Sequence, residues 1–292
     1  METSKIIAPL FAIALVTAFL PSSAAQQAKG PNTAPATAPA PGHPVDLVGI
    51  RLGMTAQQAA AAVRAANPGF QISNNPAFRF DLLPNVAFNE VVYARKTGDA
   101  THGQESIDLK FTQPPNQAML WSIQRNKQYA DQERPTVANL IAGLREKYGP
   151  EDGSMTPPAV AKASGVELRD AYWIFDINGQ KLPRQRAAQL AATCTAIWES
   201  SYLDRLKLPQ NPKFTNPNAA NCWENTAVTA YFTPTTPGVT GPAGLTLELV
   251  VKAVNMNLYR AHYEASEKFL RQAEQSDINQ QQQKAKQAKP AL

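Results

Sequence analysis

The chain of 292 residues is 43% hydrophobic and 17% charged, with a formal net charge of +5 and two cysteines. This composition excludes a fully disordered chain, which contains fewer apolar residues, a long coiled coil, which contains more Glu, Lys and Leu, and a small disulfide-stapled domain, which needs more cysteines in a shorter chain. The length suits one large domain or two small ones.

The N-terminal segment has the pattern of a secretory signal peptide. Lys5 precedes an apolar run over residues 6–20, which is shorter than the run of about 20 residues that a spanning helix needs. Ser23 and Ala25 place small residues just before a cleavage position at Gln26. We predict a signal peptide over residues 1–25 and a periplasmic or secreted protein with no transmembrane helix after cleavage. Retention of the segment as an anchor is the alternative.

Two segments of low complexity flank the folded part. Residues 26–43 are dominated by Ala, Pro and Thr, which is typical of an extended linker. Residues 276–292 are polar and rich in Gln and Lys. We expect both segments to be disordered, so that the fold lies within residues 44–275.

The first half of this part, residues 44–130, begins with a helix. Thr55 is a good N-cap, and Gln58 stands three residues later, as in a capping box. Ala59 and Val63 then share a helical face, and Pro68 follows the helix. Short β-prone runs come next, at residues 78–83, 90–95, 106–112 and 119–125. The pattern predicts one helix followed by an antiparallel meander.

The second half, residues 131–275, repeats the order of helix and strands. Apolar residues at helical spacing predict a helix from Val137 to Tyr148, ended by Gly149. Asn178-Gly179 predicts a hairpin with a type I′ turn within residues 171–182. Further strands are expected at residues 194–199, 226–232 and 245–254, and a last helix at residues 257–275. We predict an α+β fold with helices packed on antiparallel sheets, in two helix-plus-sheet halves.

The two cysteines, Cys194 and Cys222, are predicted to form a disulfide, because an even pair in an exported chain usually does. The loop that it closes would stabilise the fold by about 3 to 4 kcal/mol. A zinc site would need further ligands close to these cysteines, and a catalytic cysteine would need a histidine partner. The three histidines, His43, His102 and His262, are scattered along the sequence.

Aromatic residues surround these cysteines in the sequence: Tyr172, Trp173, Trp198 and Trp223. Packing in a core beside the disulfide is the favoured interpretation. The alternative is that some of these residues line a groove for a peptide, a glycan or a lipid.

Basic residues gather between positions 181 and 213, where only Glu199 and Asp204 oppose them. The cluster consists of Lys181, Arg184, Arg186, Arg205, Lys207 and Lys213. A solvated loop is the common interpretation of such a cluster, and a contact site for an acidic protein partner or an anionic envelope surface is the functional one. Export argues against nucleic acid as the partner.

The sequence contains no known catalytic or nucleotide-binding motif. Residues 176–179 imitate part of a calcium loop, but position 182 is Leu where that loop needs Glu, so a hairpin turn is the better interpretation. We therefore predict no metal, no cofactor and no enzymatic activity.

The stretch Gly49–Thr55, which reads GIRLGMT and leads into an Ala- and Gln-rich helix, resembles the opening of SmpA/BamE-like envelope modules. The same helix-plus-sheet architecture, in tandem, occurs in the β-lactamase inhibitor protein fold. Residues 144–150 resemble helix ends in bacterial secreted proteins with the same opening. The chain differs from the envelope lipoproteins because it lacks a lipid-acceptor cysteine.

The resemblance implies a non-catalytic module that binds proteins, with no catalytic residues to transfer. We expect an exported envelope protein that binds a protein partner through its sheet face or its basic loop. A binding module for a small apolar or anionic ligand is the alternative, and a hydrolase with an unrecognised site is a third hypothesis.

Overall fold

The computed structural model describes residues 45–74, 78–80, 83–88, 91–99, 102–155, 170–199, 221–234 and 244–287. The predicted signal peptide and linker lie outside these residues. The fold is of the α+β class, as predicted, with helices packed on antiparallel sheets.

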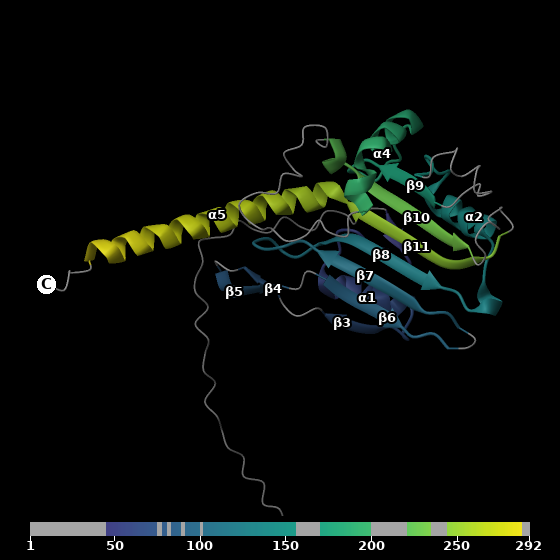
Figure 1. The fold of residues 1–292 in the computed structure, drawn as a ribbon, viewed down its shortest axis with the longest axis horizontal. Coiled ribbons are helices and arrows are strands. Elements are labelled where there is room, and N and C mark those ends of the chain that lie inside the picture. Colours follow the sequence, from purple (N-terminus) through teal and green to yellow (C-terminus); the bar gives the residue numbers. More distant parts are fainter. Residues whose placement is uncertain are drawn as a thin grey trace, which may run out of the picture. The chain divides into compact units, whose positions relative to one another are not determined.

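A seven-stranded antiparallel sheet forms the centre of the fold (Figure 1). Its strands, in spatial order, are β3 (Gln71–Asn74), β6 (Val91–Lys96), β7 (Glu105–Phe111), β8 (Leu120–Gln128), β11 (Thr246–Asn255), β10 (Thr226–Pro234) and β9 (Asp170–Phe175). Two small sheets pair β1 (Asp46–Leu47) with β2 (Ile50–Arg51) and β4 (Phe78–Phe80) with β5 (Leu83–Phe88). The helices are α1 (Ala56–Ala66), α2 (Val137–Tyr148), α4 (Arg184–Glu199) and α5 (Met256–Gln287), with a short 3-10 turn at Asp131–Glu133.

The two predicted halves share this one sheet. To this sheet the first half contributes α1 and then β3, β6, β7 and β8, and the second contributes α2 and then β9, β10 and β11, with α4 between β9 and β10. Their last strands, β8 and β11, pair with each other at the centre. In each half the threonine before the helix bridges to the residue before the last strand, Thr55 to Met119 and Thr136 to Leu245. The halves therefore repeat the same contact, although α4 interrupts the strands of the second half.

Both of these helices begin at a threonine cap. Thr55 Oγ1 accepts the backbone N–H of Gln58 at 3.3 Å, and Gln58 Oε1 accepts the backbone N–H of Thr55 at 2.9 Å. This reciprocal pair confirms the predicted capping box. Thr136 Oγ1 accepts the N–H of Asn139 at 3.2 Å in the same way. Gly149, with φ of 77°, ends α2 where the sequence predicts.

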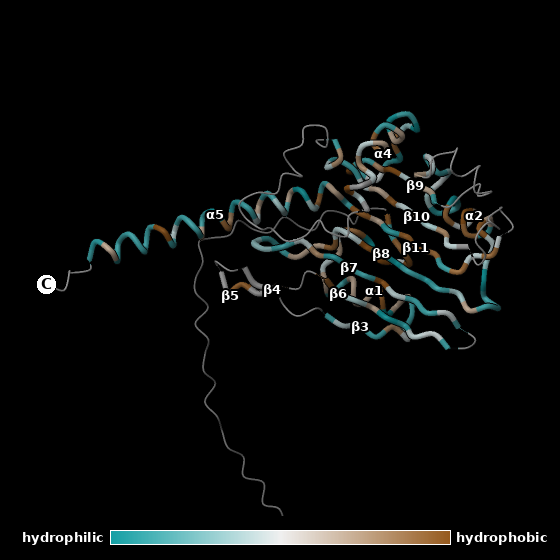
Figure 2. Tube along the Cα trace, in the orientation of Figure 1, coloured by the Kyte–Doolittle hydropathy of each residue, from teal (hydrophilic) through white to brown (hydrophobic). Residues whose placement is uncertain are grey.

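An apolar core lies on each face of the sheet, and the second core covers only part of its face. On one face, α1 and α2 pack on the sheet through a core that includes Val63 and Ile141. On the other face, α4 packs on β9 and β10. Strand β9 is buried on both sides, since Trp173 joins the first core and Ile174 the second. Figure 2 shows the hydrophobic residues along these strands and the hydrophilic residues along the distal part of α5.

The predicted strand at residues 194–199 is wrong, because these residues end helix α4. The buried positions of α4 are Ala187, Leu190, Ala191, Cys194 and Trp198, which is the spacing of a buried helical face. The Ala- and Gln-rich run that precedes this segment has a high helix propensity, which outweighs the β propensity of its last residues.

Two further predictions need correction. Helix α5 continues through Gln287, where the sequence predicted a disordered tail from residue 276. Gln and Lys are good helix formers, and pairs such as Gln275 to Asn279 at 3.1 Å stabilise the exposed turns. The turn after β9 is not of type I′, since Gly179 but not Asn178 has a positive φ. Asp176 Oδ1 holds this turn by accepting the N–H groups of Asn178 and Gln180.

The single strand predicted at residues 78–83 is instead a pair of short strands, β4 and β5. None of the helices that the structure describes is long and apolar enough to cross a membrane.

Candidate functional site

The predicted disulfide is present. Cys194 on α4 bonds to Cys222 with a Sγ–Sγ distance of 2.02 Å and a Cα–Cα distance of 5.4 Å. Both residues are fully buried, in the core between α4 and the sheet. The bond therefore ties α4 to the turn that precedes β10.

The four aromatic residues proposed for a groove are all buried, with at most 6% of their surface exposed. Tyr172, Trp198 and Trp223 lie in the core beneath α4. Trp173 faces the opposite side of the sheet, where its Nε1 donates to the carbonyl oxygen of Gly149 at 2.8 Å. This burial agrees with the core-packing interpretation, and the four residues do not share one face.

The basic cluster is only partly within the described residues. Lys181 Nζ lies 3.4 Å from Oδ1 of the buried Asp152. Arg184 and Arg186 are exposed in the first turn of α4. The remaining three cluster residues, Arg205, Lys207 and Lys213, lie outside the described residues.

Two buried carboxylates, which the sequence analysis did not single out, lie at the β9 edge of the sheet. Asp152 Oδ2 accepts the N–H of Ile174 at 2.8 Å, and burial raises the pKa of this carboxyl. Asp170 Oδ1 accepts the N–H of Met155 at 2.6 Å and the hydroxyl of Ser154 at 2.7 Å. These bonds hold the segment after α2 along β9 and so protect the edge strand.

The second face of the sheet is polar on strands β6, β7 and β8. The register places Tyr93, Asp108 and Gln124 side by side, and Arg95, Ser106 and Asn126 in the next row. Among the residues that the structure describes, Trp121 is the only one from these three strands that belongs to the apolar core on this face. Helix α4 covers the face over β9 and β10, so the polar rows form a separate surface, which we call the polar sheet face.

The side chains of the polar sheet face are held by one another. Arg95 Nη1 lies 2.9 Å from Asp108 Oδ1, and its guanidinium lies 4.8 Å from the centre of the Tyr93 ring. Burial raises the pKa of Asp108 despite this cation. Gln124 Nε2 donates to Asn126 Oδ1 at 3.2 Å, and Asn126 Nδ2 donates to Ser106 Oγ at 3.3 Å. The face thus presents oriented amides and hydroxyls.

A pocket of about 390 Å³ lies at the end of this face. The described residues that line it all have polar or charged side chains: Arg95, Lys96, Thr97, Gln104, Glu105, Ser106, Asn126, Gln128 and Glu248. The sequence analysis singled out none of these residues. The sequence pattern that could have indicated this face is the alternation in residues 106–112, which places Asp108 and Lys110 on one face of the strand and Ile107 and Leu109 on the other.

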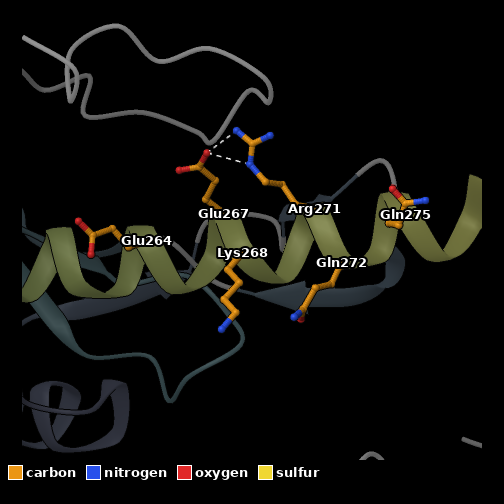
Figure 3. Close-up of a pocket in the computed structure, with 6 residues that line it drawn as sticks. All are labelled: Glu264, Glu267, Lys268, Arg271, Gln272 and Gln275. Atoms are coloured by element: carbon orange, nitrogen blue, oxygen red, sulfur yellow. Dashed lines mark hydrogen bonds and ion pairs between the residues drawn. The ribbon is translucent and has the colours of Figure 1, made fainter.

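A second pocket, of about 410 Å³, lies along α5 (Figure 3). Among the residues that the structure describes, its lining comes from this one helix: Glu264, Glu267, Lys268, Arg271, Gln272 and Gln275. Arg271 Nη2 pairs with Glu267 Oε1 at 2.6 Å, one turn away. This arrangement is that of a solvated helix face.

The described residues contain no group of three or more His, Cys, Asp and Glu side chains that could hold a metal ion. His102 lies beside Asp99 in a loop, and His262 lies on α5, where burial lowers the pKa of its imidazole. Comparison of the chain with protein-family models, curated proteins and solved structures finds no match.

Proposed function

We propose that the chain is an exported, non-catalytic protein that binds a protein partner through the polar sheet face. The observation that carries this proposal is the asymmetry of the sheet. One face is covered by α1 and α2, whereas the other is covered by α4 and the start of α5 over part of its area and carries polar side chains on β6, β7 and β8. A protein surface that carries oriented amides, a tyrosine and paired charges suits a polar, reversible interface.

Three further features support the proposal. The buried Cys194–Cys222 disulfide fits an oxidising compartment, in agreement with the signal-peptide pattern of residues 1–25. The resemblance of residues 49–55 to the opening of SmpA/BamE-like envelope modules likewise implies a non-catalytic module that binds proteins. The buried carboxylates Asp152 and Asp170 are both bonded to backbone N–H groups at the sheet edge, which favours a structural role over a hydrolytic one.

Site-specific photocrosslinking tests this proposal. A photoreactive phenylalanine analogue at Tyr93 keeps the shape of the side chain and places the probe on the polar sheet face. The same analogue at Glu146, which is exposed on α2, is the matched control. We expect irradiation of cells that express the protein to give a protein adduct at Tyr93 and none at Glu146. Equal adducts at both positions, or none at Tyr93, would remove this face as the interface.

A further inference from the structure

We propose that the pocket at the end of the polar sheet face binds a short free peptide, whose carboxylate lies at Arg95 and whose ammonium lies at Glu248. This ligand is distinct from the protein partner proposed above, and the inference does not depend on that partner. It rests on the separation of charge across the pocket, on the polar lining between the charges and on the size of the pocket.

Opposite charges lie at opposite sides of the pocket. Arg95 is on β6 and Glu248 is on β11, and both side chains are on the polar sheet face. Arg95 contacts Asp108 through Nη1, so further guanidinium N–H groups remain for a carboxylate. Glu248 takes part in none of the ion pairs between the residues that the structure describes. Two further charged residues line the pocket. Glu105 is already paired with Arg125 at 2.6 Å, and Lys96, next to Arg95 on β6, adds a second cation at the same end as Arg95.

The residues that line the pocket between these charges can form hydrogen bonds with a peptide backbone. Gln104, Asn126 and Gln128 carry amide groups, each of which offers both donors and an acceptor. A peptide unit likewise offers one N–H and one carbonyl oxygen. Asn126 is already oriented by Gln124 and Ser106, so less rotamer freedom is lost when it binds.

The dimensions select a short ligand. Three strand-to-strand steps separate β6 from β11, and at about 4.8 Å per step these span about 14 Å. An extended peptide of about four residues, at about 3.4 Å per residue, has its two charged ends this far apart. The pocket volume of about 390 Å³ limits the side chains of such a peptide to small ones.

The test uses tetra-alanine and its capped forms in isothermal titration with the purified protein. N-acetylation removes the ammonium group, and C-terminal amidation removes the carboxylate. We expect each cap to weaken binding by about threefold to fivefold, as for an exposed ion pair, and the two caps together to weaken it further. Maltotetraose, which is neutral and of similar length, is expected to bind more weakly than tetra-alanine.

Two variants assign the ends of the peptide. In Glu248→Gln, acetylation should no longer weaken binding, while amidation still does. In Arg95→Gln the pattern should be the reverse. Glu146→Gln, at an exposed position on α2, is the control and should respond to both caps as the unmodified protein does.

Because each variant is compared with itself across capped and uncapped ligands, a general loss of stability cannot imitate this crossed pattern. The proposal is overturned if tetra-alanine does not bind at millimolar concentration, if maltotetraose binds as tightly, or if Glu248→Gln keeps the full response to acetylation.

Discussion

Glu151 accepts two hydrogen bonds from Arg145, to its Oε1 at 2.6 Å and its Oε2 at 2.7 Å, and these lower the pKa of the carboxyl to about 2. Because this value lies below the ordinary 4.5, the ionised pair stabilises the fold above pH 4.5. The contribution is lost as the pH falls through about 2. It should amount to less than about 1 kcal/mol, since the Arg145 side chain is 53% exposed.

Arg145→Met should therefore return the pKa of Glu151 to near its ordinary value. Titration of the Glu151 carboxyl carbon by NMR measures this directly, and the variant should also lose the acid-side slope in its free energy of unfolding. Arg64→Met, at an exposed position on α1, is the control. A Glu151 pKa that stays near 2 in Arg145→Met would show that the arginine is not the cause.

The contact of a single residue could be predicted from the sequence where its partner is only a few positions away in the chain. Thr55 and Gln58 are three positions apart, so the spacing alone indicates their contact. Asp152 and Ile174 are 22 positions apart, and their bond exists only because the chain returns along the edge of β9. No local pattern marks such an aspartate, which explains why the sequence analysis missed it.

At the scale of elements, the threonine caps are expected to stabilise the two halves to a similar degree. Thr55→Ala and Thr136→Ala should each lower the free energy of unfolding by about 1 kcal/mol, because each leaves a helix N–H without its acceptor. Urea denaturation measures the loss. Thr→Ser at either position keeps the hydroxyl and should cost less than half as much. Alanine variants as stable as the parent would mean that the bridges to Met119 and Leu245 suffice to hold the helix starts.

Helices α1 and α2 were predictable because each carries its own cap, its apolar spacing and its stop signal. Helix α4 was not predictable from residues 194–199 alone, because Thr195, Ile197 and Trp198 favour a strand, and the helical spacing of its buried residues includes the turns before Cys194. The position of the polar sheet face depends on this helix, since α4 covers one part of the face and not the other. The alternation of apolar and polar residues predicted strands with one buried face. Which part of the other face stays polar depends on where the helices pack in the tertiary structure.

At the scale of the whole molecule, the two halves form one core. The core beneath α1 and α2 contains Val63 from the first half and Ile141 from the second. The central strands β8 and β11 pair from Ser122–Val254 to Gln128–Glu248. The sequence order of helix and strands does not predict that the two halves unite in one sheet, because pairing between β8 and β11 joins residues more than 100 positions apart.

This union predicts that the halves unfold together. Separating them would expose the shared core and break the β8–β11 ladder, so neither half should keep its structure when the other is lost. Hydrogen exchange measured by mass spectrometry in increasing urea tests this without any substitution. Peptides from β7 and from β10 should lose protection at the same urea concentration. Two separate midpoints, with β7 unfolding while β10 stays protected, would show that each half is stable alone and that the β8–β11 pairing contributes little.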